Sequence, residues 1–288
     1  MYRLSHSQNY LHDKCLVRYL VKQSSITDED LVIEIGSGKG ILTESLAERA
    51  KHVHAIEKDR TLNESLRDAF SRTPNITVHS ADFLTYRLPA KQPYKIFSNI
   101  PFTITADLIR KILAGDNPPV DTYLILQREA AEKFAGQPLN SETLTSLLYK
   151  PWFRFNLLRT FKPTDFIPVP KVTAVLLRIE KRSPPLIRAE QTSLYKDFIT
   201  HGFTRNQVSL KKDYEQVFGH VQFTRLAQDL CFSSRAKPTD ITFEQWLGMF
   251  DYFTIGVLEE RKGKVVGALK KLQQEQQGLN KTHRNRGS

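Results

Sequence analysis

Short apolar runs alternate with helical periods along the first half of the chain. Runs typical of buried strands cover residues 30–36, 52–56, 76–81, 94–98 and 122–127. Apolar positions at helical spacing cover residues 10–23, 60–70 and 103–113, and further helices are predicted to begin at residues 41 and 129. This alternation predicts an α/β fold, in which a mostly parallel sheet carries helices on both faces.

The second half follows a different pattern. Two late strands are predicted over residues 153–161 and 172–179, and helical patterns follow at residues 194–203, 223–231 and 243–250. Between the second of these strands and the first of these helices, Ser183-Pro184-Pro185 is typical of a domain boundary. From residue 259 the composition shifts to Lys, Gln and Gly, with a candidate basic helix over residues 265–277 and an end, residues 280–288, expected to be disordered when free. We therefore expect a sheet domain over residues 1–182, a small helical domain over 183–258 and a flexible basic tail over 259–288.

A glycine-rich turn follows the first predicted strand, where residues 34–40 are Glu-Ile-Gly-Ser-Gly-Lys-Gly. Gly36, Gly38 and Gly40 let the backbone turn sharply and approach a ligand before the next helix begins. The spacing is G-x-G-x-G and lacks the third glycine of the dinucleotide fingerprint. The motif alone is therefore weak, and a tight turn without a ligand is the alternative.

Acidic residues follow the next two predicted strands. Glu57 lies 21 residues after Gly36, where a carboxylate would accept hydrogen bonds from two ribose hydroxyls. Asp82 ends the third strand segment and can accept from the amino group of an adenine. Solvated strand-end acids are the alternative for each. Ligands of open α/β sheets lie outside the carboxyl ends of the strands, so this succession favours a nucleoside-containing ligand.

The tetrapeptide Asn99-Ile100-Pro101-Phe102 comes directly after the fourth apolar run. It offers an amide, a backbone carbonyl held by a following proline, and an aromatic face. The amine of adenine is a poor nucleophile, because its lone pair is delocalised into the ring. Two acceptors on its hydrogens can draw the nitrogen towards tetrahedral geometry, while a stacked aromatic ring holds the base. The alternative is a strand end with a turn-forming proline, which the preceding motifs make less favourable.

These motifs resemble, in order and spacing, the S-adenosylmethionine-dependent rRNA adenine N6-methyltransferases. Residues 7–11 (Ser-Gln-Asn-Tyr-Leu) and 166–172 (Phe-Ile-Pro-Val-Pro-Lys-Val) also look like elements of that family, so the motifs span about residues 5–180. Asn-Ile-Pro-Phe is closer to the Erm branch, whose members methylate 23S rRNA and confer macrolide, lincosamide and streptogramin B resistance. The KsgA branch, which acts on the small subunit, more usually has Asn-Leu-Pro-Tyr.

The resemblance implies a Rossmann-like class I methyltransferase sheet with an antiparallel final hairpin and a small C-terminal helical domain that recognises the substrate. It also implies that the target adenosine is flipped out of its RNA context. Asn99 Oδ1 and the Ile100 carbonyl, which is held by Pro101, would then accept from its N6 amino group. Phe102 and Phe166 would stack on its two faces, although a core aromatic is the alternative for Phe166. The implied contacts with S-adenosylmethionine come from Asn9, Leu11, Gly36, Gly38, Glu57, Asp82 and Asn99.

The charge distribution fits an RNA substrate. The formal net charge is +11, which indicates a polyanionic partner. Residues 259–288 hold eight Lys and Arg against three Asp and Glu, whereas residues 184–258 hold eight of each. The remaining net charge of +6 therefore lies in residues 1–183, with the proposed site, where it fits phosphate contacts. We expect 23S rRNA as the partner, with an adenosine of the peptidyl transferase region as the target by resemblance.

Other features exclude several classes of protein. Cys15 and Cys231 are the only cysteines, which supports neither a disulfide framework nor a cysteine zinc site. No apolar run approaches transmembrane length, and no histidine spacing is typical of a metal site. We expect a cytoplasmic monomer that needs no metal.

Three alternatives remain at this point. The first is KsgA-like dimethylation of small-subunit rRNA. The second is a nicotinamide-dependent dehydrogenase, which fits Gly36 and Glu57 but leaves residues 99–102 and the positive charge unexplained. The third is a non-enzymatic nucleic-acid-binding factor on a methyltransferase scaffold, which does not account for an intact set of site residues.

Overall fold

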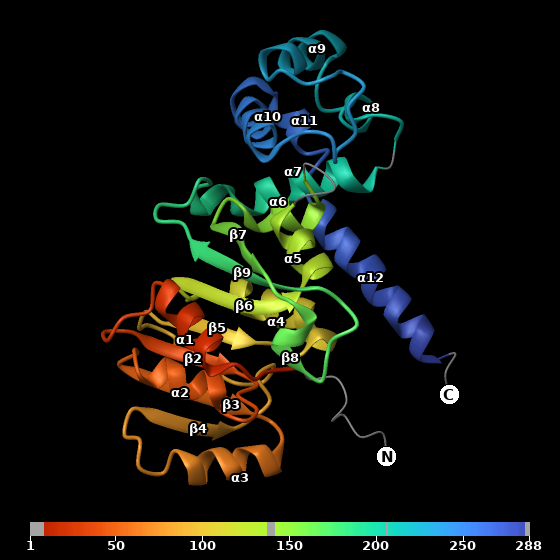
Figure 1. The fold of residues 1–288 in the computed structure, drawn as a ribbon. Helices are drawn as coiled ribbons and strands as arrows, with labels where there is room; N and C mark the ends of the chain where they lie inside the picture. The colour runs from red at the N-terminus through yellow and green to blue at the C-terminus, as the bar shows by residue number, and fades with distance from the viewer. Residues whose placement is uncertain (1–8, 137–141, 206, 286–288) are drawn as a thin grey trace. The chain divides into compact units, whose positions relative to one another are not determined.

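A computed structural model describes residues 9–136, 142–205 and 207–285. Its main feature is a seven-stranded sheet of order β4-β3-β2-β5-β6-β9-β7 (Figure 1). The first five strands in this order are parallel, and β9 pairs antiparallel with both β6 and β7. The predicted sheet with antiparallel final strands is therefore confirmed. Its strands are β2 Leu31–Ile35, β3 His52–Glu57, β4 Ile76–Ser80, β5 Lys95–Asn99, β6 Asp121–Gln127, β7 Phe153–Thr160 and β9 Ala174–Lys181.

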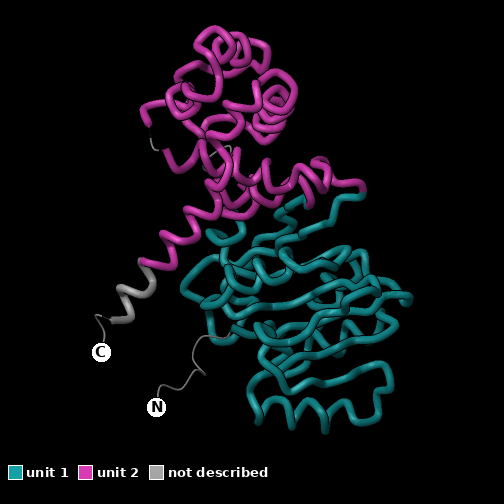
Figure 2. The backbone as a smooth tube through the Cα atoms, turned by 180° about the vertical axis from the view of Figure 1, so that it is seen from behind, with its two compact units in different colours: residues 1–132, 153–183 teal, residues 133–152, 184–288 magenta. Residues whose placement is uncertain are grey.

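The chain divides into two compact units (Figure 2). The first lies within residues 1–132 and 153–183, and the second within residues 133–152 and 184–288. No local pattern predicts that residues 133–152 group with the later helices. The reason lies in helix α6, Leu144–Tyr149, whose Leu147 is fully buried in the core of the second unit and accepts a hydrogen bond from the Tyr195 hydroxyl at 3.1 Å. The roles predicted for residues 1–182, 183–258 and 259–288 stay predictions.

Apolar side chains cover both faces of the central strands in the first unit. Because strand side chains alternate between faces, Val32 and Phe97 pack with α1 and α2 in one cluster, whereas Ile33 and Ile96 are buried on the other face. The helices that accompany the sheet are α1 Lys14–Gln23, α2 Ile41–Ala47, α3 Arg60–Ala69, α4 Thr105–Ala114 and, across the unit boundary, α5 Arg128–Ala135.

The first helix begins later than the sequence predicts. Asp13 caps α1 because its Oδ1 accepts from the backbone N–H groups of Cys15 and Leu16 at 2.8 and 3.2 Å. Upstream of this cap, strand β1 Tyr10–Leu11 pairs antiparallel with β8 Phe166–Ile167. The predicted helix over residues 10–23 is therefore wrong at its start, because residues 10–11 form a strand with residues 166–167, which are distant in sequence.

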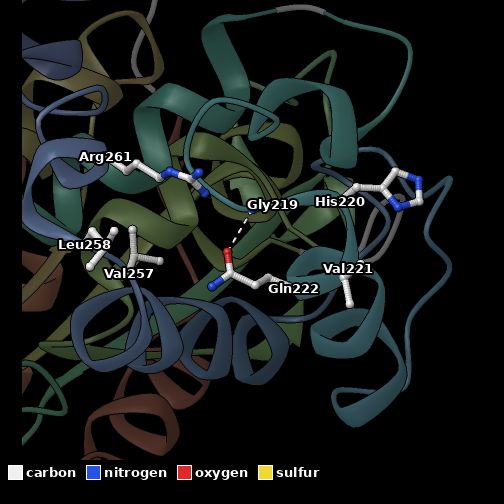
Figure 3. Close-up of a pocket in the computed structure, with 7 residues that line it drawn as sticks. All are labelled: Gly219, His220, Val221, Gln222, Val257, Leu258 and Arg261. Atoms are coloured by element: carbon white, nitrogen blue, oxygen red, sulfur yellow. Dashed lines mark hydrogen bonds between the residues drawn. The ribbon is translucent and has the colours of Figure 1, made fainter.

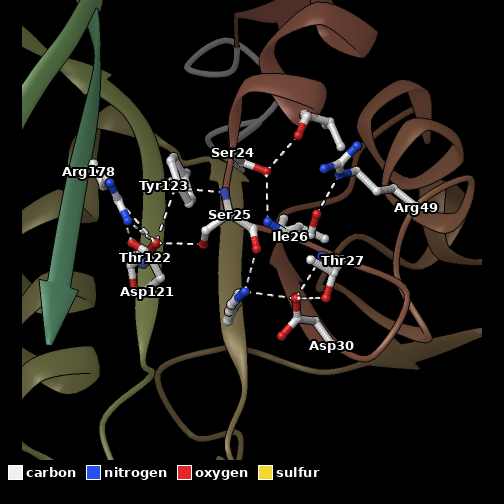
Figure 4. Close-up of polar contacts among 12 residues, drawn as sticks. Ser24, Ser25, Ile26, Thr27, Asp30, Arg49, Asp121, Thr122, Tyr123 and Arg178 are labelled. Atoms are coloured by element: carbon white, nitrogen blue, oxygen red, sulfur yellow. Dashed lines mark hydrogen bonds and ion pairs between the residues drawn. The ribbon is translucent and has the colours of Figure 1, made fainter.

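A polar network joins the amino ends of β2, β5 and β6 to the end of β9 (Figure 4). Asp121 forms an ion pair with Arg178, with Oδ2 and Nη2 2.7 Å apart. The same Oδ2 accepts a hydrogen bond from the Ser25 hydroxyl at 2.6 Å. Beside it, Lys95 forms a 2.7 Å ion pair with Asp30. These contacts fix the amino ends of the strands and leave the opposite, carboxyl ends available for a site.

The second unit is helical, with α6, α7 Thr192–Thr204, α8 Leu210–Asp213, α9 His220–Asp229, α10 Phe243–Gly256, α11 Glu259–Lys262 and α12 Ala268–Asn285. Its core is aromatic. The centroid of the Phe198 ring lies 4.9 Å from that of Tyr214 and 6.2 Å from that of Trp246. Helix α12 continues to Asn285, and residues 286–288 lie outside the described residues. The disorder expected from residue 280 in the free protein stays a prediction. Among the helices that the structure describes, none combines the length and apolarity needed to cross a membrane.

Candidate active site

A small pocket opens at the carboxyl ends of β2 and β5, within the first unit. It is lined by Asn9, Tyr10, Gly36, Asn99, Ile100, Pro101 and Phe102. Six of these seven residues were singled out in the sequence, and segments about ninety positions apart bring them together. The sheet therefore places the predicted glycine turn beside the predicted amine-binding loop.

The glycine turn adopts a backbone that side chains disfavour. Gly36, Gly38 and Gly40 have φ angles of 70°, 56° and 80°. The N–H groups of Gly36 and Ser37 both donate to the Ile56 carbonyl, at 2.8 and 3.3 Å, which anchors the turn to β3. A Cβ atom on Gly38 would lie 2.5 Å from the ring of Tyr10. The turn is thus held by its neighbours in a conformation that glycine adopts readily, and its predicted approach to the cofactor stays a prediction.

Glu57 lies beside this turn at the end of β3 and is only 3% exposed. Its Oε2 accepts from the Gly38 N–H at 2.9 Å, and its Oε1 accepts from the Asp59 N–H at 2.8 Å. Each carboxylate oxygen has a second lone pair, so both can still accept a hydroxyl hydrogen. The predicted contact of Glu57 with two ribose hydroxyls stays a prediction.

Asp82 follows β4 and is held in an exposed ion pair. Its Oδ2 accepts from Lys58 Nζ at 2.8 Å, and its Oδ1 accepts from the Leu84 N–H at 2.9 Å. The hydrogen bond from Lys58 is the main cause that lowers the pKa of Asp82. The carboxylate is therefore ionised at neutral pH, and its predicted contact with the adenine of the cofactor stays a prediction.

The amide of Asn99 has a fixed orientation. Its Nδ2 donates to the backbone carbonyl of Asn9 at 2.7 Å, which leaves Oδ1 as an acceptor. Asn9 is itself anchored, because its Nδ2 donates to the Pro168 carbonyl at 2.6 Å. The Ile100 N–H donates to the Ile125 carbonyl at 3.1 Å, whereas within the described residues no hydrogen bond to the Ile100 carbonyl is recorded. Two acceptors of the predicted kind thus come from consecutive residues.

Phe102 begins a short 3₁₀ turn, Phe102–Ile104, and is partly buried against the core of the first unit. Leu11 and Phe166, by contrast, face that core as neighbours in the β1–β8 pair. Phe166 is 1% exposed, and its ring packs edge-on against Phe161 with the centroids 5.5 Å apart. Phe166 is almost inaccessible to solvent in this arrangement, and its stacking role stays a prediction, as does the cofactor contact of Leu11.

Tyr10 is the pocket residue that the sequence analysis did not select. Its ring covers Gly38, and the Lys39 ammonium lies 5.8 Å from the ring centroid. Burial, followed by the nearby charge of Glu57, raises the pKa of the Tyr10 hydroxyl. The available signal was its position between Asn9 and Leu11, two residues that the family resemblance had already singled out.

A buried acid lies behind the glycine turn. Glu34 on β2 is 2% exposed, and its Oε2 accepts from the Thr43 hydroxyl of α2 at 2.5 Å. Burial is the main cause that raises the pKa of Glu34 to about 8. The carboxyl group is therefore largely protonated at neutral pH, and it joins the strand before the turn to the helix after it.

A second, larger cavity of about 400 Å³ lies in the helical unit (Figure 3). Its walls come from the start of α9 and from residues 257–261, and include Val221, Leu258 and Arg261. It contains none of the predicted site residues. Across the part of the chain that the structure describes, no group of three His, Cys, Asp or Glu is placed to hold a metal ion.

The sheet order, the glycine turn after β2 and the acid that ends β3 define a class I S-adenosylmethionine-dependent methyltransferase. Within that class, the model of the ribosomal RNA adenine dimethylase family matches residues 2–254, and the chain belongs to this family.

Individual relatives agree with this assignment. An rRNA adenine N-6-methyltransferase of Bacteroides fragilis is 32% identical over 247 residues, which cover 84% of this chain and 90% of the relative. A ribosomal RNA small subunit methyltransferase A of Acaryochloris marina is 27% identical and covers 85% of this chain and 94% of its own. The crystal structure of the 23S rRNA methyltransferase ErmE matches with a TM-score of 0.80 at 26% identity, covering 85% of this chain and 100% of that one.

The chain is therefore an enzyme that methylates rRNA adenine at N6 with S-adenosylmethionine, as the motifs predicted. The dehydrogenase and the non-enzymatic factor are set aside.

Proposed function

We propose that this enzyme methylates an adenosine of 23S rRNA, in the peptidyl transferase region, and thereby confers resistance to macrolides, lincosamides and streptogramin B. The observation that carries the proposal is the similarity to ErmE, which extends over all of that structure at 26% identity. The Asn-Ile-Pro-Phe sequence of the pocket loop supports the same branch of the family. We propose further that the enzyme acts in the cytoplasm as a monomer and without a metal.

In this proposal, some residues of the site bind the cofactor and others orient the target adenosine. S-adenosylmethionine supplies a methyl group on a positively charged sulfur. Glu57 accepts from the ribose, and Asp82 accepts from the adenine of the cofactor. Asn99 Oδ1 and the Ile100 carbonyl would accept from the N6 amino group of the target adenosine, which would direct its lone pair away from these two oxygens and make it available for methylation.

Orientation supplies much of the acceleration in this proposal. Phe102 stacks on the target base, and the bond from Asn99 to the Asn9 carbonyl holds the acceptor in place before the base arrives. Among the described residues that line the pocket, Tyr10 is the one with a titratable side chain, and its raised pKa keeps it neutral. The amine becomes acidic once it is methylated, so its proton can pass to water.

Expression in a macrolide-susceptible bacterium tests the proposal. The gene and its Asn99→Ala variant are expressed to the same level, erythromycin susceptibility is measured, and primer extension maps modified adenosines in both ribosomal RNAs. We expect resistance and a primer-extension stop in 23S rRNA with the unchanged enzyme, and neither with the variant. Unmodified 23S rRNA in resistant or susceptible cells would refute the proposal.

KsgA-like modification of the small subunit is the second candidate. The 27% identity to the small subunit methyltransferase of Acaryochloris marina favours it. The same mapping distinguishes the two, because this candidate predicts modified adenosines in small-subunit rRNA and unchanged macrolide susceptibility.

A further inference from the structure

A basic pocket of about 240 Å³ lies in the helical unit, between the end of α7 and the start of α12. Its walls include Thr204 and Arg205 at the end of α7, Lys264 in the connection to α12, and Lys271 in the first turns of α12. These residues lie in segments about sixty positions apart. Lys264 and Lys271 also lie beyond residue 254, where the match to the family model ends.

The connection that carries these lysines is firmly anchored. Val265 is fully buried in the core of the helical unit. Asp197 of α7 caps α12, since its Oδ2 accepts from the Gly267 N–H at 2.8 Å and its Oδ1 from the Leu269 N–H at 2.9 Å. The cap uses both carboxylate oxygens for backbone N–H groups and holds α12 against α7. The basic side chains therefore project from a defined backbone.

Positive charge dominates this pocket. Arg205, Lys264 and Lys271 are exposed, and within the described residues none of them is recorded in an ion pair or a side-chain hydrogen bond. Glu275 is the acid of the lining. Burial is the main cause that lowers the pKa of His201, and the hydrogen bond between its ring and the Asp213 carbonyl opposes this shift, so His201 adds little to the positive charge. Three cations thus face one lining carboxylate.

We propose that this pocket binds the phosphate backbone of the rRNA substrate. The chemistry fits because Arg and Lys offer hydrogen-bond donors and charge to phosphate oxygens, and the Thr204 hydroxyl adds a neutral donor. RNA is the polyanion that a member of this family must hold while one nucleotide is flipped out. The inference deepens the proposed function by assigning an RNA contact to a segment beyond the matched family region.

A matched pair of triple variants tests this assignment. The test variant combines Arg205→Ala, Lys264→Ala and Lys271→Ala, and the control combines Arg225→Ala, Arg235→Ala and Lys237→Ala. Both remove three exposed cations from the same unit. Binding of a fluorescent 23S rRNA fragment is measured by anisotropy at several KCl concentrations. Calorimetric affinity for S-adenosylmethionine and the melting temperature report on the intact fold.

For the test variant we expect RNA affinity to fall roughly 10- to 100-fold at 0.1 M KCl, with a log–log salt slope that is shallower by about 2 to 3. The control should change much less in both quantities, and Glu275→Gln should strengthen binding because it removes the opposing charge. An unchanged salt slope, or equal losses in test and control variants, would overturn the assignment. If the assignment fails in this way but the enzyme without substitutions methylates 23S rRNA, the proposed function stands. If the enzyme without substitutions is inactive on rRNA, the proposed function itself is rejected.

Discussion

The side chain of Asn99 donates a hydrogen bond to the backbone carbonyl of Asn9, with Nδ2 and the oxygen 2.7 Å apart. Asn9 in turn donates from its own side chain to the Pro168 carbonyl at 2.6 Å. Three segments that are distant in sequence are thereby tied together at the pocket. The consequence for chemistry is that the amide of Asn99 presents its oxygen, because its nitrogen is already engaged.

Replacement of Asn99 tests this orientation. Asn99→Ala removes the acceptor, and Asn99→Asp keeps acceptor oxygens but turns one of them against the Asn9 carbonyl. We expect both variants to lose methyl transfer by about 10²- to 10³-fold, measured with radiolabelled cofactor on a 23S rRNA transcript. Cofactor affinity should change far less. Near-normal turnover of either variant would remove Asn99 from the catalytic role.

Substitutions of Phe102 test whether its ring stacks on the target base or only packs against the core. A base stacked on an aromatic ring is stabilised by about 1–3 kcal/mol, so Phe102→Ala and Phe102→Leu should each lower kcat/KM by roughly 10- to 100-fold. Phe102→Tyr keeps the ring and should stay within a few-fold of the unchanged enzyme. If Phe102→Leu were as active as Phe102→Tyr, packing against the core, rather than stacking on the base, would account for the residue.

Glu57 provides a test of cofactor binding. In Glu57→Gln the amide nitrogen would face one of the N–H donors of Gly38 and Asp59, and the negative acceptor for the ribose is lost. We expect the affinity for S-adenosylmethionine to fall by about 10- to 100-fold in calorimetry, in line with hydrogen bonds to a charged group. Glu44 forms an ion pair with Lys14 at 2.7 Å and has a partly exposed side chain. Changed to Gln, it serves as the control and should bind the cofactor normally.

Gly38 tests the tightness of the turn. An alanine there needs a φ of 56° and brings its Cβ to 2.5 Å from the Tyr10 ring. We expect Gly38→Ala to lower the free energy of unfolding by about 1–3 kcal/mol and to weaken cofactor binding. Gly115→Ala is the comparison, since its nearest contact is 4.0 Å away. Similar unfolding midpoints for the two variants in urea would contradict this explanation.

Glu34 gives the stability of the enzyme a pH dependence. Its folded-state pKa of about 8 lies above the ordinary value near 4.5, so the folded state holds the proton more tightly. This contribution is fully present below about pH 4.5 and is lost as the pH rises through 8. Glu34→Gln keeps the shape without the proton equilibrium. We expect the variant to gain stability relative to the unchanged protein by a few kcal/mol between pH 5 and 8, measured by urea unfolding, whereas a constant difference across that range would refute the assignment.

The sequence by itself determined the alternation of strands and helices and the residues that follow each parallel strand. These features are local: apolar runs specify buried strands, and glycine, acid and Asn-Ile-Pro-Phe motifs lie next to them in the chain. Because parallel strands bring their carboxyl ends to one edge, the meeting of Gly36 with Asn99 followed from the order of elements alone.

Only the tertiary structure decided contacts between segments that no local pattern connects. The β1–β8 pair moved residues 10–11 out of the predicted helix, buried Phe166 and placed Tyr10 over Gly38. Leu147 joined the helical unit, and Asp197 fixed the start of α12. In each case the determining interaction is a hydrogen bond or a shared core between residues that are far apart in sequence. Such contacts depend on the tertiary fold and leave no periodic signal in the sequence.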